Sequence, residues 1–292
     1  MATAVSQDDR THLARALDLA ERGRGAVSPN PMVGCVLVRD SDVIGEGWHS
    51  ERGGLHAERA ALADCAKRGN DPAGAVAYVT LEPCAHQGRQ PPCANALIEA
   101  RVARVAYLSD DPSEKASGRG PGMLRDAGIE VELASGPEAA AARLLIQPFR
   151  KHARTGRPLV TLKSALTLDG RTATALGDSK WISGHESRAL VHRWRAEADA
   201  VAIGIGTALA DDALLTARDV DPPAHRQPAR VVFDSAARLP TDSALVRSVA
   251  EAPVLLITSP DAPPERADPL REAGVDLLVV DGDPVGRVVA AL

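Results

Sequence analysis

The first half of the chain alternates between helical and strand-like patterns of apolar residues. Residues 9–22 place apolar side chains at helical spacing and stop before Gly23, a residue common just after a helix. Residues 33–40 and 42–49 are two apolar runs joined by a short polar turn around Ser41, which predicts a β-hairpin. The alternation continues with predicted helices at 56–68, 91–102, 120–128 and 137–147, and predicted strands at 75–82, 104–110 and 129–134. Helices that alternate with strands in this way predict a layered α/β domain.

The second half shows the same kind of alternation after a polar break. Residues 147–158, "QPFRKHARTGRP", are basic and bracketed by prolines, so we interpret them as a linker. The apolar runs that follow predict strands at 159–170, 200–206, 229–235, 253–259 and 275–280, and residues 185–198 predict a helix between the first two. We therefore expect a first domain over 1–147 and a second α/β domain over 159–292.

Composition narrows the classes of function. The 292 residues are 45% hydrophobic and 25% charged, as in ordinary globular proteins. The net charge of −5 and the aromatic content of 2% argue against a nucleic-acid partner, which would favour basic surfaces and stacking rings. The N-terminal residues lack a secretory signal, and the apolar runs are shorter than the roughly 18–20 residues of a membrane span. We therefore expect a cytoplasmic protein with no membrane partner. Its four cysteines are too few for a disulfide framework, and close-set cysteines in such a protein more often serve metal binding or catalysis.

Three residues have the placement of a catalytic metal site. His56 begins a predicted helix, Cys84 follows a predicted strand, and Cys93 lies in the first turn of the next helix. Two cysteines and one histidine are an accepted ligand set for catalytic zinc, which keeps its fourth position open. Helix N-termini also favour thiolates over thiols. We therefore predict Zn²⁺ at these three residues.

A carboxylate stands next to this predicted site. Glu58 follows His56 by two residues, within the first turn of the same helix. Zinc lowers the pKa of a bound water to roughly 7, and a carboxylate that does not bind the metal can carry the released proton.

The pattern H-x-E followed by P-C-x-x-C is typical of zinc nucleobase deaminases. Here eight residues separate the two cysteines, which argues against the nucleic-acid members of that group. A structural zinc would need a fourth protein ligand, and we interpret Cys35 and Cys65 as core residues instead.

Longer motifs are similar to one family. The stretches "SPNPMVGCVLV", "GEGWH", "HAERAAL", "TLEPCAHQGRQPPC" and "SGRGPGMLRDAGIEV" resemble the bifunctional riboflavin-biosynthesis deaminase–reductase family, RibD. In the second half, "LKSALTLDGRTA", "GDSKWISG", "WRAEADAVAIGIGTALADD", "LLTAR" and "ARVVFDS" carry the same resemblance. The resemblance implies a cytidine-deaminase-like, three-layer α/β first domain and a dihydrofolate-reductase-like second domain.

The same resemblance implies two activities in riboflavin biosynthesis. The first domain would remove by hydrolysis the 2-amino group of 2,5-diamino-6-(5-phosphoribosylamino)pyrimidin-4(3H)-one. The second domain would reduce the ribosyl group of the product to a ribityl chain with NADPH. A small phosphorylated pyrimidine is then the expected substrate. Relatives with the deaminase fold usually associate, so we also expect a homo-oligomer.

The resemblance also implies roles for individual residues. His56, Cys84 and Cys93 match the zinc ligands, Glu58 matches the proton carrier, and Asn30, in the "NPMVG" loop, would orient the pyrimidine. From their charge and position, we take His49, His86 and Arg89 as candidates for binding the 5-phosphate. The positions that contact NADPH match Ala165, Trp181, Thr207, Asp211 and Ser235. The substrate positions of the reductase match Ser179, Arg195, Leu215 and Arg218, and Lys163 is a further candidate facing the reducing site. The two arginines suit a phosphate, which a guanidinium grips through two parallel hydrogen bonds.

Two features set expectations for the second domain. The glycines of "GIGTAL" follow a predicted strand, but Leu209 stands where the dinucleotide fingerprint requires glycine or alanine, so we do not expect a Rossmann domain. Family members continue beyond the position of Leu292 with a segment that contacts NADPH and substrate. We therefore expect intact deaminase chemistry and a reductase domain that lacks its last segment, with impaired reduction.

Two alternatives stay open from the residues. One is another zinc deaminase, acting on a nucleoside or on tRNA, with an unrelated appended domain. Ammonia release from a panel of substrates would distinguish it. The other is a non-enzymatic protein that zinc stabilises, in which Glu58 would be dispensable.

Overall fold

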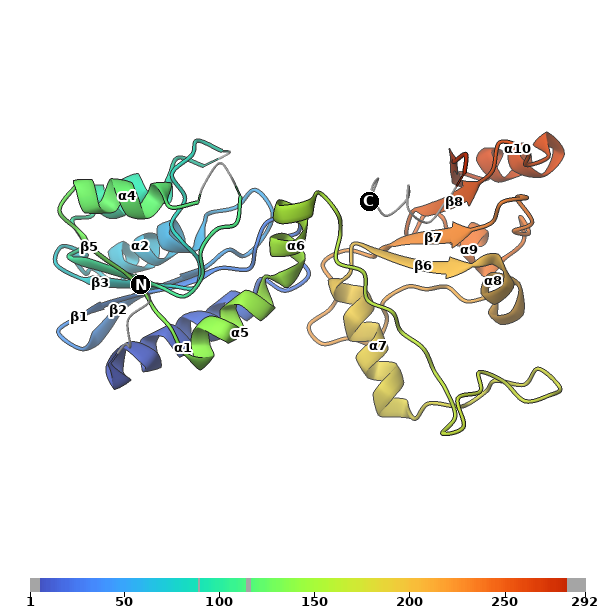
Figure 1. Cartoon of the computed structure of the whole chain (residues 1–292), viewed down its shortest axis with the longest axis horizontal. Helices are drawn as coiled ribbons and strands as arrows, with labels where there is room; N and C mark the ends of the chain where they lie inside the picture. The colour runs from blue at the N-terminus through green and yellow to red at the C-terminus, as the bar shows by residue number, and fades with distance from the viewer. Residues whose placement is uncertain (1–5, 89, 114–116, 283–292) are drawn as a thin grey trace. The chain divides into compact units, whose positions relative to one another are not determined.

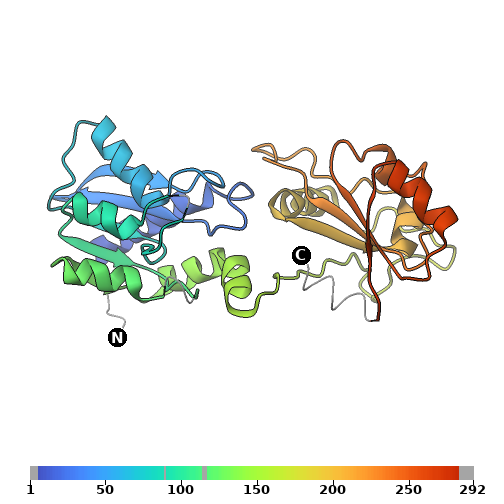
Figure 2. The same ribbon diagram turned by 90° about the horizontal axis from the view of Figure 1, so that it is seen from above.

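The computed structural model of the chain describes residues 6–88, 90–113 and 117–282. The chain divides into two compact units, Met1–Leu159 and Val160–Leu292, and each unit is built around one β-sheet (Figures 1 and 2). The division falls directly after the segment expected to be a linker. Among the helices of the described ranges, none has the length and apolar character needed to cross a membrane.

The first unit contains a five-stranded sheet. Its strands are β1 (Gly34–Arg39), β2 (Asp42–Trp48), β3 (Val76–Val79), β4 (Arg104–Tyr107) and β5 (Glu130–Leu133), in the order β2-β1-β3-β4-β5. β1 pairs antiparallel with β2 and β3, whereas β3, β4 and β5 run parallel. The predicted hairpin is confirmed, and Asp40 and Ser41 form its turn with φ angles of 52° and 69°. Positive φ at both turn positions matches the twist of the paired strands.

Helices cover both faces of this sheet. They are α1 (Gln7–Glu21), α2 (Ala57–Lys67), α3 (Cys93–Glu99), α4 (Arg119–Asp126) and α5 (Pro137–Leu145). The side chains of β1 alternate between the faces: Val36 packs in the core beneath α1 and α5, whereas Leu37 packs in the core beneath α2, α3 and α4. The unit is therefore a three-layer α/β/α structure (Figure 1), and each helix and strand predicted for this half is present.

The expected linker contains a helix, α6 (Gln147–Thr155). It has a proline in its first turn, where a missing N–H leaves no hydrogen bond unmade, and it ends at Gly156 with a φ of 64°. The buried Arg150 ties α6 to the first unit, because its Nη1 donates to Ser109 Oγ (2.8 Å) and to the carbonyl oxygen of Asp110 (2.7 Å). A polar, proline-bracketed composition is therefore compatible with an ordered, packed helix.

The second unit contains a four-stranded parallel sheet. Its strands are β6 (Ala200–Gly204), β7 (Ala229–Phe233), β8 (Val254–Thr258) and β9 (Asp276–Val279), adjacent in chain order. Helices α8 (Ile205–Asp211), α9 (Ala244–Arg247) and α10 (Pro264–Glu272) alternate with these strands, and Ile205, Leu245 and Leu270 pack into one core with Val232 and Leu256 of the sheet. Helix α7 (His185–Glu197), which precedes β6, confirms the helix predicted there.

The strand predicted at 159–170 is wrong. These residues form no helix or strand and belong to neither sheet. Their apolar side chains alternate as those of a strand would, but Val160, Leu162 and Leu168 are exposed. Alternation produces a strand only where a neighbouring strand supplies hydrogen bonds and an apolar layer supplies packing. In the described part of the chain, neither reaches this segment.

Candidate active site

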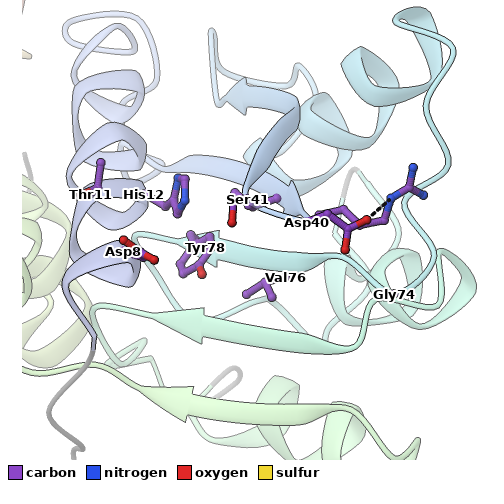
Figure 3. A pocket seen from close by; sticks show the side chains of 10 residues that line it. Asp8, Thr11, His12, Asp40, Ser41, Gly74, Val76 and Tyr78 are labelled. Carbon is purple, nitrogen blue, oxygen red and sulfur yellow. Dashed lines mark ion pairs between the residues drawn. The ribbon is translucent and has the colours of Figure 1, made fainter.

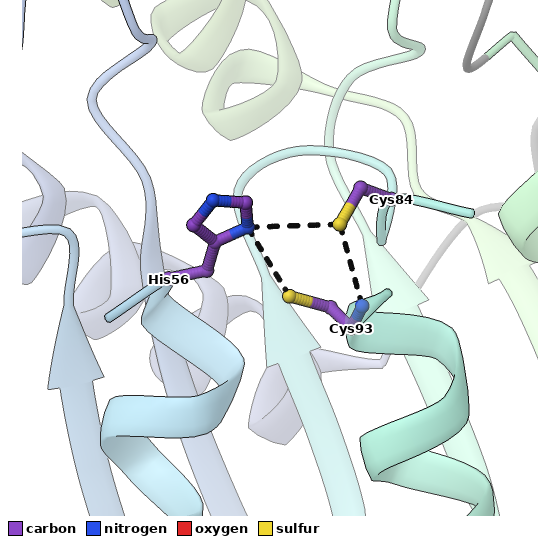
Figure 4. Close-up of side chains that lie close together, drawn as sticks. All are labelled: His56, Cys84 and Cys93. Atoms are coloured by element: carbon purple, nitrogen blue, oxygen red, sulfur yellow. Dashed lines mark hydrogen bonds between the residues drawn. The ribbon is translucent and has the colours of Figure 1, made fainter. Parts of the chain in front are cut away.

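The three predicted metal ligands converge in the first unit (Figure 4). His56 is the residue before α2, Cys84 lies in the loop after β3, and Cys93 is the first residue of α3. His56 Nδ1 lies 3.6 Å from Cys84 Sγ and 3.4 Å from Cys93 Sγ. All three ligand atoms lie within 4.8 Å of one another. This spacing fits three corners of a tetrahedron around an ion with ligand distances of about 2.0–2.3 Å.

Close backbone contacts produce this geometry. A Cβ at Gly47 of β2 would lie 2.2 Å from the backbone nitrogen of Ala61, so glycine there lets α2 pack directly against the strand. A Cβ at Gly120 of α4 would lie 1.8 Å from the carbonyl oxygen of Pro83, so glycine there lets α4 press against the loop before Cys84. The first contact positions the helix that His56 begins, and the second positions the cysteine loop.

The donor set fits zinc. The hydrogen bond from the thiol of Cys93, assisted by His56, lowers the pKa of Cys84 to about 4, so this sulfur is a thiolate at neutral pH. The backbone N–H of Cys93 also donates to Cys84 Sγ at 3.3 Å. The hydrogen bond between the Cys93 thiol and Cys84, together with burial, raises the pKa of the Cys93 thiol far above its ordinary value. A bound divalent cation favours loss of this second proton, because thiolate is the form that binds metal.

The predicted proton carrier lies next to the ligands. Glu58 is in the first turn of α2 and is only 4% exposed. Burial, and then the negative charge of Cys84, raise the pKa of its carboxyl to about 7. A carboxyl that titrates near neutral pH can accept and release a proton within one reaction cycle. The structure thus brings together the four residues on which the predicted deaminase chemistry depends.

Asn30 and His49 form a hydrogen-bonded pair near this cluster. Asn30 Nδ2 lies 3.0 Å from His49 Nε2, and His49 Nδ1 lies 2.9 Å from the carbonyl oxygen of Leu55. The His49 ring packs edge-on against His56, with ring centroids 5.5 Å apart. Burial and the neighbouring His56 lower the pKa of His49, which favours the neutral ring. With both ring nitrogens engaged, His49 orients Asn30, a relation that the sequence did not indicate.

The other two phosphate candidates lie in the loop between the cysteines. His86 is exposed on this loop. Arg89 lies outside the described residues. Their role in binding the 5-phosphate stays a prediction.

Glu82 is a residue of this site that the sequence analysis missed. It is buried and accepts hydrogen bonds from the backbone N–H groups of Gly118 (2.6 Å) and Asp111 (3.4 Å). It thereby joins the loop after β4 to the loop that carries Cys84. Burial raises the pKa of Glu82 to about 7. The signal in the sequence was its place in "TLEPC", two residues before a ligand.

Three of the predicted NADPH positions lie near the carboxyl ends of adjacent parallel strands in the second unit. Thr207 is in the first turn of α8, which follows β6, and Asp211 ends that helix. Ser235 follows β7, whose last residue, Phe233, pairs with the last residue of β6. Ligands of open α/β sheets bind at this edge. The arrangement is therefore suited to a nucleotide cofactor, although no Rossmann fingerprint is present.

Three of the predicted substrate positions converge on one residue, Thr216. Arg195 of α7 donates from Nη1 to the carbonyl oxygen of Thr216 (3.4 Å), and Arg218 donates from Nη1 to Thr216 Oγ1 (3.1 Å). Leu215 is buried beside them. Burial and the positive charge of Arg218 lower the pKa of Arg195, so the two guanidiniums are close enough to repel each other. An anion bound between them would relieve that repulsion.

The remaining predicted positions lie on residues 156–184, which form no helix or strand. Lys163 and Ser179 are on this segment, as are Ala165 and Trp181. Trp181 is 73% exposed, and the guanidinium of Arg188 lies 4.3 Å from its ring centroid. The structure does not assemble these four residues with the others, and their roles stay predictions.

A separate pocket of about 430 Å³ lies in the first unit between α1, the β1–β2 turn and β3 (Figure 3). His12, Arg39, Asp40 and Tyr78 are among the residues that line it. None of the residues predicted for catalysis, metal, cofactor or substrate lines this pocket. It is therefore not part of the candidate active site.

Both halves of the chain match known families. Residues 6–109 match the cytidine and deoxycytidylate deaminase zinc-binding region, and residues 158–288 match the RibD C-terminal domain. The first match lies within the unit that holds the predicted zinc ligands, and the second covers most of the unit that holds the predicted NADPH positions. The first unit therefore has the cytidine-deaminase-like fold, and the second has the dihydrofolate-reductase-like fold of RibD proteins.

Whole-chain relatives agree with these matches. The riboflavin biosynthesis protein RibD of Actinobacillus pleuropneumoniae is 42% identical over 271 residues, which are 93% of this chain and 70% of that protein. The structure of Acinetobacter baumannii RibD (form 1) is 40% identical, with a TM-score of 0.85, and the match covers 98% of this chain and 77% of that one. The structure of a diaminohydroxyphosphoribosylaminopyrimidine deaminase/5-amino-6-(5-phosphoribosylamino)uracil reductase from Thermotoga maritima is 37% identical, with the same TM-score and coverage. This chain belongs to the RibD family of riboflavin biosynthesis proteins.

Proposed function

We propose that the first unit deaminates 2,5-diamino-6-(5-phosphoribosylamino)pyrimidin-4(3H)-one by hydrolysis. The observation that carries this proposal is the convergence of His56, Cys84 and Cys93 beside the buried Glu58. A Cys₂His set leaves the fourth zinc position free, as a catalytic site requires. When bound at these residues, zinc would supply a Lewis acid that makes water a better nucleophile at neutral pH.

In the proposed reaction Glu58 moves protons between water and the leaving group. Its carboxylate accepts a proton as the water oxygen forms a bond to C2 of the pyrimidine. The carboxyl passes this proton to ring nitrogen N1, which receives the electron pair of the C2=N1 double bond. It then takes up the remaining hydroxyl proton and delivers it to the 2-amino group, so that the C2–N bond to that group breaks and ammonia leaves as the C2 carbonyl forms. A pKa of about 7 suits both directions of transfer.

The remaining groups of the first unit would hold the substrate in place. Asn30, which contacts His49, would hydrogen-bond the pyrimidine through the remaining donor and acceptor groups of its amide. His86 and Arg89, on the loop between the cysteines, would hold the 5-phosphate by charge. Glu82 fixes the neighbouring loop through its backbone hydrogen bonds.

For the second unit we propose NADPH-dependent reduction of the deaminated product. When bound there, NADPH would supply a hydride for C1 of the ribosyl group, whose bond to the ring oxygen breaks as that oxygen takes up a proton, which gives the open ribityl chain. Thr207, Asp211 and Ser235 would contact the cofactor at the carboxyl ends of β6 and β7. Arg195 and Arg218 would hold the phosphate, with Leu215 beside them. For Lys163, Ala165, Ser179 and Trp181 we propose contacts on the family resemblance alone.

The test supplies the proposed substrate to the 292-residue chain and follows two signals. Ammonia release should appear with zinc present, and NADPH oxidation should follow only after deamination. Absence of ammonia release from this substrate by zinc-loaded protein would contradict the proposal for the first unit. NADPH oxidation with the deaminated product tests the second unit separately, and absence of oxidation would contradict the proposal for that unit.

The alternative functions have less support. A nucleoside or tRNA deaminase with an unrelated appended domain is not favoured, because residues 158–288 match the RibD C-terminal domain. A protein that only needs zinc for stability would have no use for a buried carboxyl beside an incomplete ligand set. A homo-oligomeric state and a cytoplasmic location stay predictions.

A further inference from the structure

The segment that carries Arg218 in the second unit is held by other elements. Residues 212–218, between α8 and β7, form no helix or strand. Gln227 binds Ala217 twice, since Ala217 N–H donates to Gln227 Oε1 (2.7 Å) and Gln227 Nε2 donates to the carbonyl oxygen of Ala217 (2.9 Å). The buried Arg230 donates to the carbonyl oxygen of Leu214 at 3.3 Å. Side chains just before and within β7, Gln227 and Arg230, thus fix the middle of the segment.

The end of the 212–218 segment is fixed by helix α7. The backbone N–H of Arg218 donates to His192 Nδ1, on α7, at 3.1 Å. His192 is one turn before Arg195, which reaches the neighbouring Thr216. The contact therefore links the backbone under one guanidinium to the helix that presents the other.

The segment needs these outside contacts because its own backbone is not relaxed. Leu215 has a φ of 58°, in the left-handed region that branched side chains rarely occupy. Such a conformation persists only where the surroundings impose it. Removal of an outside contact should therefore let the segment move, and Arg218 would move with it.

We propose that His192 is a positioning residue, whose neutral ring holds the Arg218 backbone so that Arg195 and Arg218 together grip a phosphate group. The inference rests on the proposed substrate role of the two arginines and adds the residue that aligns them. Nδ1 accepts only when it carries no proton, so the ring must be neutral and protonated at Nε2. A protonated ring would place an N–H against the N–H of Arg218 and break the contact.

The surroundings of His192 favour its neutral form. Burial, followed by the charges of Arg195 on its own helix and Arg218 on the facing segment, lowers the pKa of His192 below 6.5. The backbone of Thr216 and the carboxylate of Asp219 act in the opposite direction and are weaker. The contact is therefore complete at neutral pH and is lost as pH falls through the lowered pKa of His192.

The test measures binding of ribose 5-phosphate to the full chain by titration calorimetry at pH 7.5 and 5.5. At pH 7.5, His192→Ala should weaken binding about five- to tenfold, as expected for one lost hydrogen bond. His192→Asn should bind as the wild type does, because its Oδ1 can stand where Nδ1 stood. His185→Asn, the same change at an exposed position of α7, is the matched control.

The comparison between the two pH values isolates the contribution of the His192 ring to binding. Phosphate itself titrates with a pKa of about 6, but this affects all variants equally. From pH 7.5 to 5.5 the wild type should therefore lose more affinity than His192→Asn. Equal pH dependence of these two proteins, or wild-type binding by His192→Ala, would overturn the inference.

Two further measurements keep the outcomes distinct. Arg195→Ala and Arg218→Ala define the binding that belongs to this site. If neither weakens binding, both the proposed substrate role and the inference fail. If either weakens binding but His192→Ala does not, only the inference is overturned.

Hydrogen exchange of the Arg218 amide in the wild type is an independent readout. The exchange should be slow at pH 7.5 relative to its intrinsic rate, and the protection should be lost at pH 5.5. Unchanged protection would overturn the inference.

Discussion

At the scale of single residues, environment rather than residue type assigns the roles in the first unit. Glu58 and Glu82 are both buried glutamates whose pKa is raised to about 7. Glu82 has its carboxylate taken up by two backbone N–H groups, so it holds a loop. Glu58 instead lies beside the predicted cysteine and histidine ligands, where its carboxyl could transfer protons during the proposed hydrolysis. We therefore assign a structural role to Glu82 and propose a catalytic role for Glu58, although both carry the same chemical group.

The catalytic assignment of Glu58 predicts a selective loss of activity. Glu58→Gln should reduce ammonia release by about 10²- to 10⁴-fold, the usual contribution of a positioned acid–base group. Zinc content should be unchanged, because Glu58 is not a ligand, and elemental analysis of the purified variant checks this. Glu51→Gln, at an exposed glutamate before His56, serves as the control and should keep full activity. Full ammonia release by Glu58→Gln would contradict the assignment.

A second residue-scale prediction concerns acid stability. Asp9 of α1 accepts hydrogen bonds from Tyr78 Oη (2.6 Å) and from two nitrogens of Arg104 (3.0 and 3.1 Å). Burial opposes ionisation of Asp9, but Arg104 and Tyr78 outweigh it and hold the pKa of Asp9 well below 3.8. Because the folded pKa is lower than the unfolded one, this stabilisation is complete above about pH 4 and declines as pH falls further.

Asp9→Asn should therefore lower the free energy of unfolding by about 3 kcal/mol at pH 7, since Arg104 keeps a partly buried charge with one partner removed. The difference from the wild type should shrink at pH 3. Hydrogen exchange of the β3 and β4 amides at the two pH values measures it. Asp8→Asn, at the exposed neighbouring position, should change little. A difference that is as large at pH 3 as at pH 7 would argue against this role.

At the scale of elements, periodic patterns were sufficient where each element packs locally. The apolar run that predicted β1 is buried on both faces of the sheet, where the consecutive residues Val36 and Leu37 face two separate cores. The pattern failed for 159–170, where Leu162 and Leu168 alternate correctly but no described strand pairs with them. It also missed helix α6, whose order comes from the long-range contact of Arg150.

The role of Arg150 can be tested on α6. Arg150→Met keeps much of the side-chain volume but removes the hydrogen bonds to Ser109 and to Asp110. Local stability of α6 should fall by about 2 kcal/mol, because the two acceptors are left without their donor. Faster amide exchange over 147–155 is the measurement. Lys151→Met, at the exposed next position, is the control, and equal exchange in both variants would show that Arg150 does not anchor the helix.

At the scale of the whole molecule, each unit has its own core and its own set of predicted site residues. The predicted zinc ligands all belong to the first unit, and the predicted NADPH positions all belong to the second. Metal binding should therefore stabilise only one of them. A ligand at a thousand times its dissociation constant contributes about 4 kcal/mol of stability.

Removal of metal by a chelator should accordingly lower the melting temperature of the first unit by about 10 °C. Differential scanning calorimetry with and without the chelator would show one transition that moves and one that stays. His56→Ala should melt at the lower temperature in both conditions, because it lacks a ligand. A chelator that shifts both transitions equally, or neither, would contradict the assignment of the metal to the first unit alone.

The sequence was enough to identify the family and to predict the metal ligands and the proton carrier. These rest on short spacings, such as His56 to Glu58, and on local patterns that any fold of this chain must respect. Folding alone decided that Glu82 joins two loops, that Arg150 anchors α6, and that His192 meets the backbone of Arg218. These contacts join positions 26 to 41 residues apart, and burial and hydrogen-bond partners at such separations depend on how the layers pack, which no local pattern encodes.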